Sequence, residues 1–197
     1  IRPEMTLDFL KKLKRSGCAW LSYGIESGSQ RVLEKMNKRF SLEVASKVLR
    51  DTKEAGISTQ ANFMFGLPTE TREDFDQTLS FLRENNSYMD TILASQSFCV
   101  IDKGTYLYDH PEEFGIRHRS HHLYWDSNNG ENDYSERFKR YEEFCKIALS
   151  LGIPETSGVL RNKPDKWHTL GDYYLHRRDY KKAIENYFEK ELAVFIT

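Results

Sequence analysis

Two segments of the chain alternate between apolar and polar side chains, and this period of two constrains the fold more than any other feature. The segments are residues 18–26 and 57–65. Their apolar positions are Leu21, Tyr23 and Ile25, then Ile57, Thr59, Ala61, Phe63 and Phe65; their polar positions are Ser22, Gly24 and Glu26, then Ser58, Gln60, Asn62 and Met64. Because successive side chains of a β-strand point to opposite faces, the pattern predicts two strands with one apolar and one polar face each.

Helical patterns separate and flank these strands. Apolar residues recur at helical spacing within residues 6–15, 30–36, 42–55 and 73–84, and a third strand is predicted at 91–100. Strands that alternate with helices of this length predict an α/β fold with parallel strands and right-handed crossovers. The polar positions gather toward the carboxyl ends of the first two strands, which favours a partial, half TIM-like barrel, with helices outside, that holds a ligand in its mouth. The alternative is an edge strand with one face in water.

Charge and composition exclude several classes of protein. The 29 basic and 30 acidic residues give a formal net charge of -1, without the basic excess typical of nucleic-acid-binding modules. A hydrophobic content of 39% indicates a globular chain, and no apolar run approaches the ~18 residues of a membrane span. Cys18, Cys99 and Cys145 are too far apart for a local metal or cluster motif, so reduced, buried thiols of a cytoplasmic protein are predicted.

The second half of the chain has a different character. Residues 118–132 are polar and predict a loop, in which the adjacent His121 and His122 are solvated rather than metal ligands. A helix is predicted at 135–151, a linker at 154–164 and a helical pair at 165–194. The predicted domains are therefore residues 1–117, a loop and helical extension at 118–160, and a helix hairpin at 161–197, the last two forming an all-α extension.

Three stretches within residues 1–117 resemble, in order and spacing, motifs of the radical SAM enzymes, where SAM is S-adenosylmethionine. Tyr-Gly-Ile-Glu-Ser-Gly-Ser at 23–29, followed by Val-Leu at 32–33 and Met-Asn-Lys at 36–38, resembles the motif after the fourth strand of that superfamily. Asn-Phe-Met-Phe-Gly-Leu-Pro-Thr-Glu-Thr at 62–71, with Asp74 and Phe75 beyond, resembles the fifth-strand motif. Val-Ile-Asp-Lys-Gly-Thr-Tyr-Leu-Tyr at 100–108 and Phe-Gly-Ile at 114–116 resemble the sixth-strand region of the cobalamin-binding branch.

The resemblance implies that the chain supplies one wall of an S-adenosylmethionine site. By the family pattern, Glu26 and Asn62 contact the ribose, and Lys38 provides the cation for the methionyl carboxylate. Met64 and the Gly66-Leu67 backbone form an apolar bed for adenine, and Ser27 adds a hydrogen bond or caps the next helix.

Each of these residues also has a purely structural interpretation. Glu26 would cap a helix, and Asn62 would brace the barrel interior. Lys38 would be a solvated surface lysine, with Arg39 beside it able to serve equally, and Met64 would belong to the core.

The sequence also departs from the family pattern. It lacks the Cys-x-x-x-Cys-x-x-Cys loop that binds the [4Fe-4S] cluster, and the glycine-rich motif of the second strand. Thr69 and Lys103 stand where glycine and proline are frequent. We therefore expect Ile1 to lie downstream of the catalytic half and this segment alone to be inactive. The whole enzyme is expected to cleave S-adenosylmethionine to a 5′-deoxyadenosyl radical, or to transfer methyl groups with cobalamin. Its substrate is unknown from the sequence.

The C-terminal residues resemble one tetratricopeptide repeat. The matching positions are Trp167, Leu170, Gly171, Tyr174, Ala183 and Tyr187. One repeat cannot bury its own faces, so we expect either a longer array or docking of this hairpin on the half-barrel. Exposed barrel edges predict a dimer or a cover by the tail.

Two other functions stay open at this point. A protein-interaction module would bind a partner through the helical tail and would need no cofactor. A barrel hydrolase would use Glu26 and Glu70 as acid and base.

Overall fold

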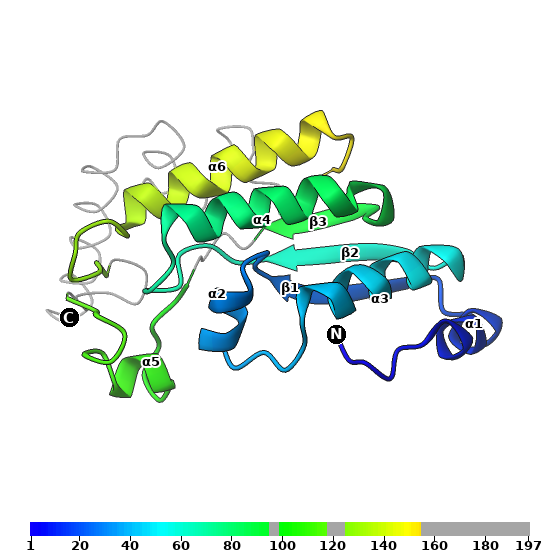
Figure 1. The fold of residues 1–197 in the computed structure, drawn as a ribbon, viewed down its shortest axis with the longest axis horizontal. Helices are drawn as coiled ribbons and strands as arrows, with labels where there is room; N and C mark the ends of the chain where they lie inside the picture. The colour runs from blue at the N-terminus through cyan, green and yellow to red at the C-terminus, as the bar shows by residue number, and fades with distance from the viewer. Residues whose placement is uncertain (95–98, 118–124, 155–197) are drawn as a thin grey trace, which may run out of the picture. The chain divides into compact units, whose positions relative to one another are not determined.

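The computed structural model describes residues 1–94, 99–117 and 125–154 (Figure 1). The chain divides into a compact unit, Ile1–Ser157, and a second unit, Gly158–Thr197. The tetratricopeptide-like hairpin and the histidine pair His121-His122 lie outside the described residues.

Three parallel strands form the sheet, in the order β1-β2-β3. They are β1 (Trp20–Glu26), β2 (Ser58–Phe63) and β3 (Thr91–Ala94). The α/β class and the parallel pairing predicted from the sequence are confirmed. The third strand is shorter than predicted, because Cys99 and Val100 do not belong to it.

The helices of the N-terminal part begin and end close to where the sequence predicts. They are α1 (Leu7–Arg15), α2 (Gln30–Lys35), α3 (Leu42–Glu54) and α4 (Arg72–Asn85), with a short 3-10 turn, η1 (Asn86–Tyr88), after α4. Each of the four α-helices starts at a serine or threonine whose hydroxyl accepts a backbone N–H: Thr6, Ser29, Ser41 and Thr71. The short helix α5 (Tyr106–Asp109) is not predicted by the sequence pattern.

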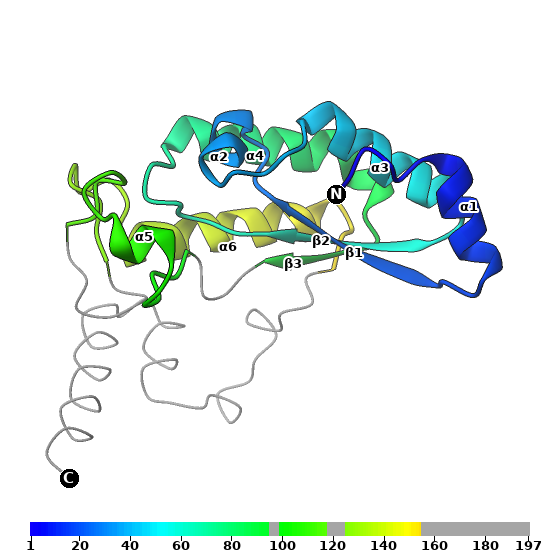
Figure 2. The same ribbon diagram turned by 90° about the horizontal axis from the view of Figure 1, so that it is seen from below.

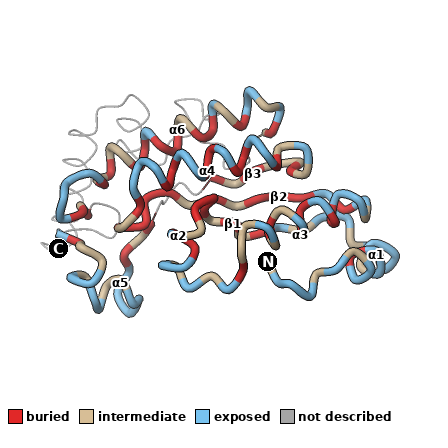
Figure 3. The backbone as a smooth tube through the Cα atoms, viewed as in Figure 1, coloured by how far each residue is buried: buried red, intermediate tan, exposed pale blue. Residues whose placement is uncertain are grey.

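The two faces of the sheet differ as the alternation predicts. Helices α3 and α4 lie on one side of the sheet (Figure 2). Buried positions recur along β1 and β2 (Figure 3). The buried side chains include Tyr23, Ile25, Ala61 and Phe63. The positions between them, such as Asn62, are only half-buried. The polar face is therefore partly accessible, and it belongs to the central strand β2 as well as to the edge strand β1.

Helix α6 (Tyr134–Ser150) confirms the helix predicted at 135–151 and packs against α4 and β3. Its stripe of Phe138, Tyr141, Phe144, Cys145 and Ala148 is buried. The described residues 125–154 belong to the same compact unit as residues 1–117. After α6 the chain returns to the sheet, where the Ile92 N–H donates to the Pro154 carbonyl over 3.0 Å.

Within the described part of the chain, none of the helices has the length and apolar character needed to cross a membrane.

Candidate polar site at the carboxyl ends of the strands

A hydrogen-bonded group of side chains occupies the polar face of the sheet. The Asn62 Nδ2 donates to Ser22 Oγ over 3.0 Å, and the Gln60 Nε2 donates to Asn62 Oδ1 over 3.0 Å. Strand register explains the contact, since Ser22 pairs with Gln60 and Gly24 with Asn62. Asn62 therefore stands one step nearer the carboxyl end than its two partners, opposite a residue without a side chain.

Glu26 ends β1 in an unusual conformation. Its φ angle is +67°, in the left-handed region that residues other than glycine adopt rarely, and the register with β2 shifts between Gly24 and Glu26. The Glu26 carbonyl accepts the Met64 N–H over 3.0 Å, so the bulge is locked to β2. Strain of this kind, held by its surroundings, is frequent at binding sites.

Lys38 reaches the same place from the end of α2. Its Nζ lies 3.0 Å from Glu26 Oε1, and both side chains are partly exposed. Asn37, at φ +54°, ends the helix, and the Lys38 N–H donates to the Leu33 carbonyl over 2.9 Å. This left-handed C-terminal turn reverses the chain and brings Lys38 back over the sheet.

The turn after β1 faces away from this polar group. Ser27 is fully buried, and its hydroxyl lies 3.1 Å from Thr78 Oγ1 on α4. The Ser29 hydroxyl, not that of Ser27, caps α2, so the capping role predicted for Ser27 is wrong. A side chain on Gly28 would collide with α4, at the Thr78 Cα and the Phe81 Cβ. The structure therefore joins Ser27 to α4, apart from Glu26, Lys38 and Asn62. Because Ser29 caps α2 and the Glu26 carboxylate pairs with Lys38, the helix-capping interpretation of Glu26 is also wrong.

The loop after β2 carries Gly66 at φ +80° and buries Leu67. Leu67 belongs to an apolar cluster with Val32, Cys99, Ile101, Ile116 and Trp125. Met64 is half-buried and packs against that cluster from the polar side of β2. Met64 and Leu67 thus share one apolar cluster, and together with Gly66 they are called the apolar border.

Glu70 cannot serve as an exposed acid or base. Its side chain is 1% exposed, one oxygen accepts the Gly66 N–H over 2.7 Å, and the same oxygen lies 2.9 Å from Arg140 Nη1. The hydrolase alternative, which needs Glu26 and Glu70 together, is therefore wrong.

Metal ligands do not gather among the described residues: they contain no group of three or more His, Cys, Asp or Glu side chains arranged to hold a metal ion. All three cysteines are free thiols. The donor set that is present, a carboxylate, an ammonium and a carboxamide, fits an organic ligand that carries hydroxyl and carboxylate groups.

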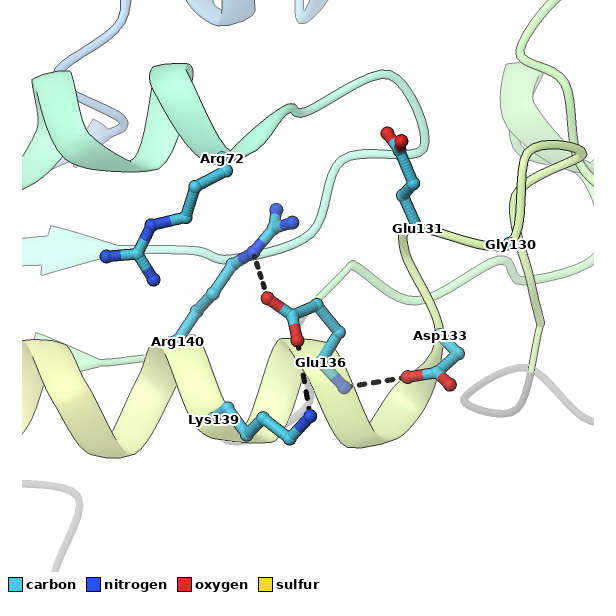
Figure 4. Close-up of a pocket in the computed structure, with 7 residues that line it drawn as sticks. All are labelled: Arg72, Gly130, Glu131, Asp133, Glu136, Lys139 and Arg140. Carbon is cyan, nitrogen blue, oxygen red and sulfur yellow. Dashed lines mark hydrogen bonds and ion pairs between the residues drawn. The ribbon is translucent and has the colours of Figure 1, made fainter.

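A separate hollow of about 460 Å³ lies where the N-terminal ends of α4 and α6 meet (Figure 4). Its rim is charged, but the charges pair with each other: Glu136 accepts from Arg140 and Lys139, both over 3.5 Å. Arg72, on the α4 side, is paired with Glu143. Most of the charged side chains around this hollow are therefore engaged with one another.

Comparison with known proteins agrees with the motifs. Residues 1–82 match the family model described as Radical SAM superfamily. Residues 1–82 are thus similar to a segment of the radical SAM domain. The matched family region contains the whole polar site, from Ser22 to Met64.

Curated relatives of the chain include a methyltransferase and a synthase of a methylthio-modified adenosine. A bacteriochlorophyllide d C-8(2)-methyltransferase of Chlorobaculum tepidum is 33% identical over 54% of this chain and 23% of its own length. A tRNA-2-methylthio-N(6)-dimethylallyladenosine synthase of Clostridium botulinum is 30% identical over 41% of this chain and 19% of its own. The chain thus spans about a fifth of the length of these relatives. Among solved structures, coproporphyrinogen III oxidase of Escherichia coli, described as a radical SAM enzyme, matches 47% of this chain and 21% of its own length, with 31% identity and a TM-score of 0.42.

Sequence reasoning did not find the residues that support the loop after β2. They are Glu70, for which the sequence suggested only an acid-base role, together with Asn132, Arg137 and Arg140. Two of them, Arg137 and Arg140, lie on α6 with buried side chains. A sequence signal existed there, because two arginines interrupt the buried stripe of an otherwise amphipathic helix.

Proposed function

We propose that this radical SAM segment forms one wall of an S-adenosylmethionine site within an enzyme built as a TIM-like barrel, of which the three described strands are part. The observation that carries the proposal is the meeting of Glu26, Lys38 and Asn62 at the carboxyl ends of β1 and β2, beside the apolar border of Met64 and Leu67. Ligands of parallel α/β sheets bind at this end of the strands.

Each part of the ligand has a chemically matched group in this proposal. Glu26 and Asn62 offer oxygen atoms that accept hydrogen bonds from a ribose diol. Lys38 is a compact cation for the methionyl carboxylate, and its contact with Glu26 keeps it over the sheet before the ligand binds. Met64 and the Gly66-Leu67 backbone provide an apolar surface for the adenine ring. Ser27 would support this wall from behind, through its contact with Thr78.

Reductive cleavage of S-adenosylmethionine requires one electron, which a [4Fe-4S] cluster supplies when it is bound. Because the described residues hold no group of metal ligands, we propose that the cluster is bound by other residues of the enzyme. Methyl transfer, with cobalamin, is the reaction we propose, on the basis of the motif at residues 100–108. The interaction-module alternative is less well supported, because the comparisons find radical SAM enzymes.

Two ligands distinguish the two ends of the proposed site. Calorimetric titration of the whole enzyme with S-adenosylmethionine and with 5′-deoxyadenosine separates them, since only the first carries a carboxylate. Asn62→Ala should weaken both ligands by about 1–3 kcal/mol, the cost of an unpaired buried hydroxyl. Lys38→Met should weaken S-adenosylmethionine and leave the affinity for 5′-deoxyadenosine unchanged.

Gln60→Ala is the matched control for Asn62→Ala. Gln60 lies on the same face of the same strand, one step farther from the carboxyl end, and donates to Asn62 Oδ1. Gln60→Ala therefore removes only a support of Asn62 and should weaken either ligand less than Asn62→Ala does. Equal losses for Gln60→Ala and Asn62→Ala would show a general disturbance of the sheet. Unchanged affinity for both ligands in Asn62→Ala would remove this residue from the site.

A further inference from the structure

We propose that Glu70, Asn132 and Arg140 are positioning residues that hold the Gly66-Leu67 loop in the shape that binds adenine. The inference rests on the proposed function, and extends the site beyond the matched family region, which ends at residue 82. Asn132 comes from the segment before α6, and Arg140 from α6 itself.

Two backbone groups of the loop are bound by side chains. The Glu70 carboxylate accepts the Gly66 N–H over 2.7 Å, and the Asn132 Nδ2 donates to the Leu67 carbonyl over 2.8 Å. Both hydrogen bonds are buried, where an unpaired backbone group would be costly. The peptide units directly before Gly66 and directly after Leu67 are therefore held by side chains from outside the loop.

Arg140 in turn fixes Glu70. Its Nη1 lies 2.9 Å from Glu70 Oε2, and the Arg140 and Glu70 side chains are 3% and 1% exposed. Losing one member of such a pair would leave a buried, unbalanced charge. Because Oε2 is the atom that also accepts the Gly66 N–H, the ion pair and the loop hydrogen bond share one oxygen.

Arg137 closes the other side of Gly66. A side chain on Gly66 would collide with the Arg137 Cγ and Cδ atoms. The Arg137 guanidinium lies 4.0 Å from the centre of the Trp125 ring and donates to the Trp125 and Asn132 carbonyls. The loop is thus enclosed between Glu70 and α6, with a shape that residues 1–82 alone cannot impose.

An exposed ion pair between the same two helices supplies a matched control. Arg72 on α4 binds Glu143 on α6 through two contacts of 2.8 and 2.9 Å, without touching the loop. The double variant Glu70→Gln/Arg140→Met removes the buried pair, and Arg72→Met/Glu143→Gln removes the exposed one. Both remove one positive and one negative charge between α4, or the turn before it, and α6.

The experiment measures binding of 5′-deoxyadenosine and amide hydrogen exchange in the whole enzyme. We expect Glu70→Gln/Arg140→Met to weaken 5′-deoxyadenosine roughly tenfold and to speed exchange at the Gly66 amide. The Thr59 amide, bound by the Asp90 carboxylate over 2.9 Å, is the internal reference and should keep its rate. Arg72→Met/Glu143→Gln should change neither quantity.

A second pair of variants makes smaller changes, so that the inference can be tested even if Glu70→Gln/Arg140→Met does not fold. Asn132→Asp removes the donor to the Leu67 carbonyl, while it keeps the size and the oxygen that faces Arg137. Asn129→Asp makes the same change in the same segment, where Asn129 contacts Ser127 and Glu131 but not the loop. Only Asn132→Asp should weaken 5′-deoxyadenosine.

The outcomes separate this inference from the proposed function. If the unmodified enzyme does not bind 5′-deoxyadenosine, the proposed function fails, while faster exchange confined to Gly66 would still support the loop anchor. If the buried-pair and exposed-pair variants weaken binding equally, or exchange speeds up at Gly66 and Thr59 together, α6 only stabilises the fold and the inference is overturned.

Discussion

The ring of Phe144 on α6 lies 4.7 Å from the ring of Phe63 on β2, and 5.0 Å from that of Phe65 just beyond the strand. Both contacts are on the apolar side of the sheet, directly behind the polar group that contains Asn62. Helix α6 is therefore part of the core that positions the proposed site, although it follows β3 by about 40 residues of chain.

Phe144→Ala should consequently destabilise the whole unit. Phe144 is fully buried, and removal of a buried phenylalanine costs about 3–5 kcal/mol. Urea unfolding should show this loss of free energy in one cooperative transition. Leu149→Ala on the same helix is the control: Leu149 is 64% exposed, so its change should stay within about 0.5 kcal/mol. A separate, early transition of α6 in Phe144→Ala would contradict its membership of the core.

Gly66→Ala tests the enclosed loop. The positive φ of Gly66 alone costs an alanine about 1–2 kcal/mol, and the collision with Arg137 adds to that cost. Gly104→Ala measures the cost of the positive φ alone, because Gly104 has φ +81° and an added Cβ would meet no atom within 4 Å. In urea unfolding Gly66→Ala should lose clearly more free energy than Gly104→Ala. Equal losses would mean that Arg137 moves aside without cost.

Asp74 should make stability depend on pH in the acid range. Burial raises the pKa of Asp74, but hydrogen bonds from Arg31, Ser29 and Thr71 outweigh burial and hold the pKa far below its ordinary value of 3.8. A depressed pKa in the folded state adds stability above the unfolded pKa of about 3.9, and this stability is lost as pH falls below it.

Asp74→Asn removes that dependence. The variant should lose about 1–3 kcal/mol at pH 7, because Ser29, Arg31 and the capping box of α4 lose their shared acceptor. Below about pH 4 the stabilities of the variant and the unmodified chain should approach each other. Asp76→Asn, two residues along the same helix at an exposed pair with Arg72, should change little at any pH. A constant difference between Asp74→Asn and the unmodified chain from pH 7 to pH 3 would disprove the assignment.

Local patterns predicted most of the fold. The alternation around Tyr23 and Phe63 and the helical spacing of the apolar residues depend on neighbours in the chain, so strands and helices could be placed from sequence. The contact between Glu26 and Lys38 also has a local cause, because only the short helix α2 separates them and Asn37 reverses the chain directly after that helix. The support of the loop by Asn132 and Arg140 could not be predicted, because those contacts join residues 65 and 70 positions apart and depend on how α6 packs.

The three thiols should differ sharply in reactivity. Burial raises the pKa of Cys99 to about 12, and because only the thiolate reacts, this thiol should be inert at neutral pH. Cys145 is also buried, whereas Cys18 is partly exposed beside β1. In the folded chain at pH 7.5, iodoacetamide should label Cys18 first, as peptide mass spectrometry would show. After unfolding in urea, all three cysteines should be labelled. Cys18→Ser gives the control, a folded chain that resists labelling until urea is added. Fast labelling of Cys99 in that variant would mean that the segment around Cys99, which packs against Trp125, opens readily. The apolar cluster that contains Leu67 would then be too mobile to hold the proposed adenine surface in place.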